Sequence, residues 1–188
     1  MNRQYYCLFV VLFFVVFARA AAAEHTYNIL FIQSYTSQTP WHNDLNEGVA
    51  KGFKENGLTV NITTEYLDAD FWSFSSEKVI MQRFCQRDRK TDMIITASDE
   101  AFYTLFSSGD SLPYQVPVVF FGIKYPDKEL IASLPNVCGF TANPDFYVIL
   151  KQAQKVFPQR KEVICVIDNS FLSNKGREDF KQEWQLFQ

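Results

Sequence analysis

The apolar run YNILFIQ (residues 27–33) leads directly into the polar and aromatic loop SYTSQT (34–39), and then into PWHN (40–43). A short continuous apolar run of this kind is typical of a buried parallel strand. The loop behind it opens a helix, because Thr39 suits a cap and Pro40 suits the first turn. Ligands of open α/β sheets bind beyond the carboxyl ends of such strands, so this loop is a candidate small-molecule rim.

The helix that follows carries an apolar stripe, because Trp41, Leu45, Val49 and Phe53 recur every four residues. Further strands are expected at 58–66, 92–98 and 116–122, and further helices from Ser75 or Ser76 and at 99–106. This alternation predicts an α/β fold, a parallel sheet with helices on both faces and right-handed crossovers. Since Trp41 begins the apolar stripe, we expect it to belong to the core more than to the rim.

The first 23 residues have the pattern of a signal peptide. Arg3 precedes an apolar run at 7–17, and the alanine-rich stretch 18–23 offers cleavage sites. The run is about half the ~20 residues that a membrane-spanning helix needs, which disfavours the alternative of an uncleaved anchor. We therefore expect a protein exported to the periplasm or another extracytoplasmic space.

Charge and cysteine content exclude some classes of protein. The net charge is −3 and no basic patch is interleaved with aromatic residues, so no nucleic-acid partner is expected. Beyond the signal region, Cys85, Cys138 and Cys165 remain, an odd number at irregular spacing. Cys85 and Cys165 are interpreted as buried thiols, and one disulfide that involves Cys138 stays open.

The pattern restarts after a weakly periodic stretch. We interpret residues 24–123 as a complete first lobe and residues 124–142 as a connection that includes a short strand at 136–141. Residues 143–188 then begin a second lobe that looks truncated. In it, Asn143 is expected to cap a helix that ends at Pro158, followed by an apolar strand at 162–167, a loop at 168–173 and a last helix.

Four predicted loops follow carboxyl ends of strands, at 34–41, 98–99, 122–125 and 168–173. The loop at 98–99 starts a helix, where backbone N–H groups favour an anionic group, although a helix cap is the simpler interpretation. No nucleophile elbow, glycine-rich phosphate loop or zinc motif is present, and His42 is interpreted as a solvated or capping residue. We expect no catalytic residue, no metal site and no cofactor.

The order of these pieces, S-Y-x(5)-W after the first strand, then IITASD, then PVVFFG, resembles the type I periplasmic binding protein fold. It is similar to the branch that contains substrate-binding proteins of ABC importers and extracytoplasmic sensor domains of histidine kinases. The resemblance implies a ligand between two lobes, bound by Ser34, Tyr35, Trp41, Ser98, Asp99, Gly122, Lys124, Asp168, Asn169 and Ser170. Lys124 is bulkier and more charged than the residues common at that position in the family.

The leading hypothesis from the sequence is a small-molecule sensor domain at the N-terminal end of a membrane histidine kinase. The alternative is a solute-binding protein that works with an ABC permease, and a secreted enzyme on a similar scaffold is a third. A homodimer is left open by the resemblance, and the ligand is not identified by it.

Overall fold

The computed structural model describes residues 25–69, 74–87, 90–142, 145–167 and 171–187. Its five strands form one parallel sheet in the order β2-β1-β3-β4-β5. They are β1 (Thr26–Gln33), β2 (Thr59–Tyr66), β3 (Met93–Ala97), β4 (Val118–Ile123) and β5 (Val137–Thr141). The helices are α2 (Trp41–Glu55), α3 (Phe74–Cys85), α4 (Asp99–Ser107), η1 (Leu112–Tyr114), α5 (Lys128–Ser133), α6 (Phe146–Val156) and α7 (Phe171–Phe187).

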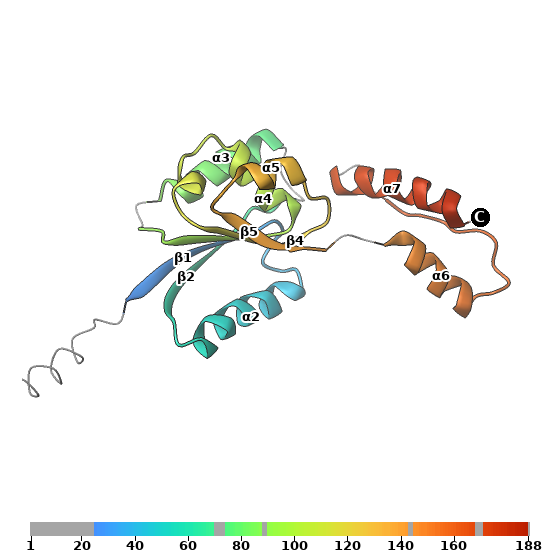
Figure 1. The fold of residues 1–188 in the computed structure, drawn as a ribbon, viewed down its shortest axis with the longest axis horizontal. Helices are drawn as coiled ribbons and strands as arrows, with labels where there is room; N and C mark the ends of the chain where they lie inside the picture. Colours follow the sequence, from blue (N-terminus) through green and yellow to red (C-terminus); the bar gives the residue numbers. More distant parts are fainter. Residues whose placement is uncertain (1–24, 70–73, 88–89, 143–144, 168–170, 188) are drawn as a thin grey trace, which may run out of the picture.

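Helices cover both faces of the sheet, as the sequence predicts (Figure 1). Alternate side chains of β1 point to opposite faces. Ile29 and Phe31 pack against α2, whereas Leu30 and Ile32 pack in the cluster that α3 and α4 cover. Helix α5 packs on that second face, against Phe102 and its neighbours. Apolar side chains of the helices therefore cover β1 on both faces.

Strand β5 extends the sheet into the stretch predicted as a connection, and helix α5 lies in the same stretch. Residues 137–141 pair in parallel with β4, with Gly139 opposite Phe120. A Cβ atom at Gly139 would lie 2.0 Å from the carbonyl oxygen of Phe120. Only glycine therefore fits this edge strand against β4, and the sheet runs to Thr141.

The predicted strand at 162–167 is wrong for the described structure. Residues 161–167 form no strand, and Ile164 and Val166 are 90% and 92% exposed. A strand needs a hydrogen-bonded neighbour, and no strand of the described part lies beside this segment. In Figure 1 the segment connects α6 and α7, which lie past the carboxyl end of β5.

Two boundaries in this region also differ from prediction. Asp145 caps α6, because its carboxylate accepts a hydrogen bond of 2.8 Å from the N–H of Val148. The predicted cap, Asn143, lies outside the described residues. Helix α7 starts at Phe171, so part of the predicted loop 168–173 is helical.

The described cysteines are all free thiols. Cys85 is partly buried, but Cys138 and Cys165 are exposed, so the expected burial of Cys165 is wrong and no disulfide forms through Cys138. Cys165 is exposed because the predicted strand at 162–167, which would have paired into the sheet, does not form in the described structure. The predicted signal peptide lies outside the described residues. Among the residues that are described, no helix combines the length and the apolar character needed to span a bilayer.

Candidate functional site

The carboxyl ends of β1, β3 and β4 meet at one edge of the sheet, where Ser34 joins two of them. Its hydroxyl donates to the carbonyl of Ala97 at 2.8 Å and accepts from the N–H of Ala101 at 2.9 Å. Ala101 is in the first turn of α4, whose N-cap residue, Ser98, makes no side-chain cap hydrogen bond. Ser34 therefore supplies the missing cap from another strand. Only 1% of the surface of Ser34 is exposed, so its hydroxyl stabilises this edge of the sheet from within.

Asp99 is fully buried, and both of its carboxylate oxygens accept backbone hydrogen bonds. Oδ2 accepts from the N–H of Lys124 at 2.9 Å, and Oδ1 accepts from the N–H of Tyr125 at 3.0 Å. The hydroxyl of Tyr103 also donates to the carbonyl of Tyr125 at 2.6 Å. Together these bonds fix the loop after β4 to the start of α4. Asp99 thus positions this loop, while the side chain of Lys124 stays exposed.

Gly122 adopts a backbone conformation that favours glycine at the end of β4. Its φ of 73° lies in the left-handed region, at an irregularity in the pairing of β4 with β5. The neighbouring backbone nitrogen of Ser98 donates to the carbonyl of Phe121 at 2.9 Å. Ser98 also has a positive φ, of 73°. The backbone is thus tightly turned at two neighbouring strand ends.

Trp41 lies at the rim of this edge, with 52% of its surface exposed, and its predicted place in the core is wrong. The other three residues of the stripe, Leu45, Val49 and Phe53, do pack on the sheet. Helix α2 starts at Trp41, with Pro40 at the N-cap position and no side-chain cap hydrogen bond. The first turn of α2 thus follows the loop beyond the end of β1, where no sheet lies underneath to cover the indole.

Trp41 is part of a series of rings that runs from the rim into the interior. Tyr35 and Trp41 meet edge to face, with ring centroids 6.4 Å apart and an interplanar angle of 77°. Trp41 meets His42 at 6.0 Å, and His42 packs on Tyr66 at 5.5 Å. His42 is 1% exposed, so its interpretation as a solvated residue is wrong. Burial lowers the pKa of His42, although the backbone of Thr36 and the charge of Asp68 act in the opposite direction.

Glu100 lies behind Tyr35 and was not predicted from the sequence. The hydroxyl of Tyr35 donates to Oε1 of Glu100 at 3.2 Å, whereas Oε2 is buried without a hydrogen-bond partner in the described part of the chain. Burial raises the pKa of Glu100, and the charges of Asp99 and Glu77 raise it further. The only signal in the sequence is its place in the first turn of a helix directly after a buried strand.

A polar cluster lies under the rim, on the α2 face of the sheet. Gln33 is fully buried, and its Nε2 donates to Oδ1 of Asn46 at 2.8 Å. Asn46 in turn donates to the hydroxyl of Tyr66 at 3.1 Å. These bonds connect β1, α2 and β2 directly below the ring series, so they hold the rim in place.

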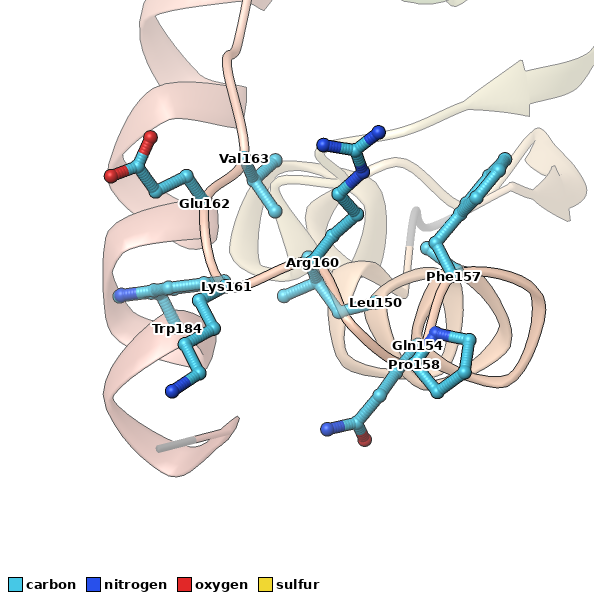
Figure 2. A pocket seen from close by; sticks show the side chains of 10 residues that line it. Leu150, Gln154, Phe157, Pro158, Arg160, Lys161, Glu162, Val163 and Trp184 are labelled. Atoms are coloured by element: carbon cyan, nitrogen blue, oxygen red, sulfur yellow. The ribbon is translucent and has the colours of Figure 1, made fainter.

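Two cavities lie farther along the chain, beside α6 and α7. One, of about 580 Å³, is lined by Lys124 and Tyr125 after β4, by mainly apolar residues of α6, α7 and the segment between them, and by Ser173 and Arg177 of α7. The other, of about 540 Å³, lies between α6 and α7, with Leu150 and Trp184 on its walls (Figure 2). Asp168, Asn169 and Ser170 lie outside the described residues. Within the described chain, no group of three His, Cys, Asp or Glu side chains is placed to hold a metal ion.

No protein-family model and no curated protein matches the chain significantly. Solved structures do match its fold. A conserved domain protein from Vibrio cholerae aligns with a TM-score of 0.66 and 15% identity, over 85% of this chain and 53% of that chain. An ABC domain from Streptococcus pneumonia, in complex with L-Trp, aligns with a TM-score of 0.63 and 19% identity, over 82% of this chain and 52% of that chain.

A 5-methylthioribose transporter solute-binding protein from Thermotoga lettingae aligns with a TM-score of 0.51 and 18% identity, over 84% of this chain and 47% of that chain. The chain thus spans about half the length of the solved structures that it matches. At these identities the similarity concerns the fold alone. The parallel five-stranded sheet and these matches together show that the chain has the fold of the type I periplasmic binding proteins.

Proposed function

We propose that this chain binds a small organic molecule outside the cytoplasm, as part of a solute-binding protein that delivers it to an ABC importer. The observation that carries the proposal is the half-exposed ring of Trp41, which packs against the partly buried Tyr35 at the carboxyl edge of the sheet. Ligands of open parallel sheets bind at this edge. The proposal is supported by neighbours in the same fold that were crystallised with L-Trp and with 5-methylthioribose.

We divide the predicted site residues by what surrounds them. Tyr35, Trp41, Ser98, Gly122 and Lys124 are proposed to face the ligand, because each lies at the carboxyl edge and none is fully buried. Ser34 and Asp99 are proposed as supports, since their polar atoms are occupied by the protein itself. Asp168, Asn169 and Ser170 are proposed for the opposite wall.

The proposed working motion is closure of two lobes around the ligand. The first lobe would run to Thr141, where β5 ends, and the second would begin with α6. A ligand that touches both lobes stabilises the closed form and shifts the population toward it. We propose a binding role and not catalysis for this segment.

The sensor-kinase form of the hypothesis rests on the sequence resemblance alone, as does the homodimer. Among the matched structures, one is named a transporter solute-binding protein and another, from Clostridium difficile, a substrate-binding protein. The importer form therefore has more support. The genes around this one discriminate the two forms: permease and ATPase genes support the importer, whereas a membrane helix and kinase motifs in the same protein support the sensor.

A thermal-shift screen of small metabolites tests the proposal. A ligand at 100 times its Kd stabilises the folded state by about 2.7 kcal/mol, which raises Tm by roughly 5–10 °C for a chain of this size. We expect Tyr35→Ala and Trp41→Ala to remove most of that shift. The matched control is Tyr114→Ala, because Tyr114 is 55% exposed in η1, before β4 begins. A shift that survives both rim substitutions would place the ligand elsewhere.

A further inference from the structure

We propose that His42 holds the rim loop in place as a neutral imidazole, and that protonation of its ring releases this loop together with Trp41. The rim loop is the segment 34–40, between the end of β1 and the start of α2. The proposal concerns the free protein, so it goes beyond the proposed function and does not depend on the ligand. It makes His42 a positioning residue and the rim an element that responds to acid.

His42 is enclosed where α2, the end of β2 and the rim loop meet. Only 1% of its surface is exposed. Its ring packs on Tyr66 of β2, with centroids 5.5 Å apart and an interplanar angle of 33°, and meets the indole of Trp41 at 6.0 Å and 79°. Its backbone N–H donates to the carbonyl of Thr39 in the rim loop at 3.0 Å. A displacement of this ring therefore disturbs Trp41 and the rim loop together.

One nitrogen of the buried ring has no partner. Nδ1 of His42 is buried and makes no hydrogen bond within the described part of the chain. In a neutral imidazole this nitrogen can stay a bare acceptor, whereas in the imidazolium both nitrogens carry a proton. Protonation would thus leave a charged N–H donor buried without an acceptor, which costs more than an unpaired neutral acceptor. It therefore favours a position of the ring in which Nδ1 reaches water.

The charged groups around the ring offset this cost only in part. Asp68, which follows β2, and the backbone of Thr36 both act to raise the pKa of His42, but the larger effect of burial lowers it below 6.5. Tyr66 faces the ring from β2 with its aromatic surface. Asp44 is the acid in the first turn of α2, where the helix dipole opposes a cation. The neutral ring is thus the form that this site stabilises.

The sign of the pH dependence follows from these pKa values. In the closed rim the pKa of His42 is lowered, whereas in a released loop the ring regains the ordinary value of 6.5. The released form therefore binds the proton more tightly than the closed form. The closed rim is fully favoured above pH 6.5 and becomes less stable as the pH falls through the lowered pKa, so acid shifts the population toward release.

Acrylamide quenching of Trp41 tests the proposal, in a parent variant whose other tryptophans are replaced by Trp72→Phe and Trp184→Phe. We expect its bimolecular quenching constant to rise by roughly twofold or more from pH 7.5 to pH 5.0, because a released loop exposes the indole further. His42→Phe keeps a ring but takes no proton, so its constant should be equal at both pH values. His42→Gln should also give equal constants, with a smaller side chain. His25→Gln removes the other, exposed histidine of the chain and should keep the rise.

A quenching constant that stays unchanged with pH in the parent variant would overturn the proposal. An equal rise in His42→Phe and His42→Gln would also overturn it, as would loss of the rise in His25→Gln. Circular dichroism at both pH values separates release of the rim from loss of the fold. The helical signal should persist at pH 5.0, and its loss at that pH would overturn a release that is confined to the rim.

Discussion

At the scale of single residues, the polar side chains at the strand ends differ in what they contact. Ser34 and Asp99 are buried, and each bonds backbone groups of a neighbouring element. Trp41 keeps about half of its surface exposed, and Tyr35 is only partly buried. A serine or an aspartate after a strand has the same pattern in the sequence whether it faces a ligand or another strand. The sequence therefore predicts which residues gather at this edge, but not which of them support it.

Gly139 gives a prediction about packing at the β5 edge. Its Cβ would lie 2.0 Å from the carbonyl oxygen of Phe120, a backbone atom that cannot move aside cheaply. We expect Gly139→Ala to lower the free energy of unfolding by about 1–3 kcal/mol, measured by urea denaturation. Gly48→Ala is the matched control in α2, where no atom lies within 4 Å, and it should stabilise the protein by about 0.5–1 kcal/mol. Equal effects of the two substitutions would contradict the packing at β5.

Glu77 gives a prediction about pH. It is 6% exposed and accepts a hydrogen bond from Oγ1 of Thr104 at 3.1 Å, and burial raises its pKa above the ordinary 4.5. The folded state therefore holds this proton more tightly than the unfolded state. Its contribution to stability is complete below pH 4.5 and is lost as the pH rises through the raised pKa, at no more than about 1.4 kcal/mol per pH unit.

Glu77→Gln should remove this dependence and should be more stable than the parent protein above that range. Urea denaturation at a series of pH values measures the effect, with the exposed Glu47→Gln as the control. A pH profile that stays unchanged in Glu77→Gln would mean that this carboxyl group is not buried as the structure places it.

At the scale of elements, strands were predictable where an apolar run has a neighbour to pair with. The runs that became β1, β3 and β4 are continuous and buried from both faces. The run at 162–167 is also apolar but has no neighbouring strand in the described part of the chain, and Ile164 and Val166 remain exposed, because strand pairing depends on other segments and not on the run itself. The predicted burial of Trp41 was wrong for a similar reason. Helical periodicity predicts which face of the helix a residue occupies, but not whether the sheet extends beneath that position.

Thiol labelling tests how exposed α3, β5 and residues 161–167 are, because each of them carries one free cysteine. Burial raises the pKa of Cys85 to about 12, so at pH 8 its partly buried thiol stays protonated and reacts slowly with alkylating reagents. We expect iodoacetamide at pH 8 to modify Cys138 and Cys165 at least tenfold faster than Cys85. Peptide mass spectrometry measures each site separately. Slow labelling of Cys165 would contradict the exposed conformation of residues 161–167.

At the scale of the whole molecule, the order of strands and loops predicted the fold better than any single motif. The five-stranded sheet has the predicted parallel direction, with helices on both faces, and it matches structures at 15–19% identity. The site was harder to predict, because it depends on contacts between loops that are far apart in sequence. Tyr35 and Glu100, for example, are 65 residues apart and meet through one hydrogen bond.

The central claim is that a small molecule binds against Trp41 at the carboxyl edge of the sheet. The most direct measurement is the fluorescence of a variant in which Trp72→Phe and Trp184→Phe leave Trp41 as the sole tryptophan. The account predicts that a ligand found in the thermal-shift screen moves the emission of Trp41 to shorter wavelength, with saturation at the same Kd, because the half-exposed indole leaves water. A saturating ligand that leaves this emission unchanged would contradict the account.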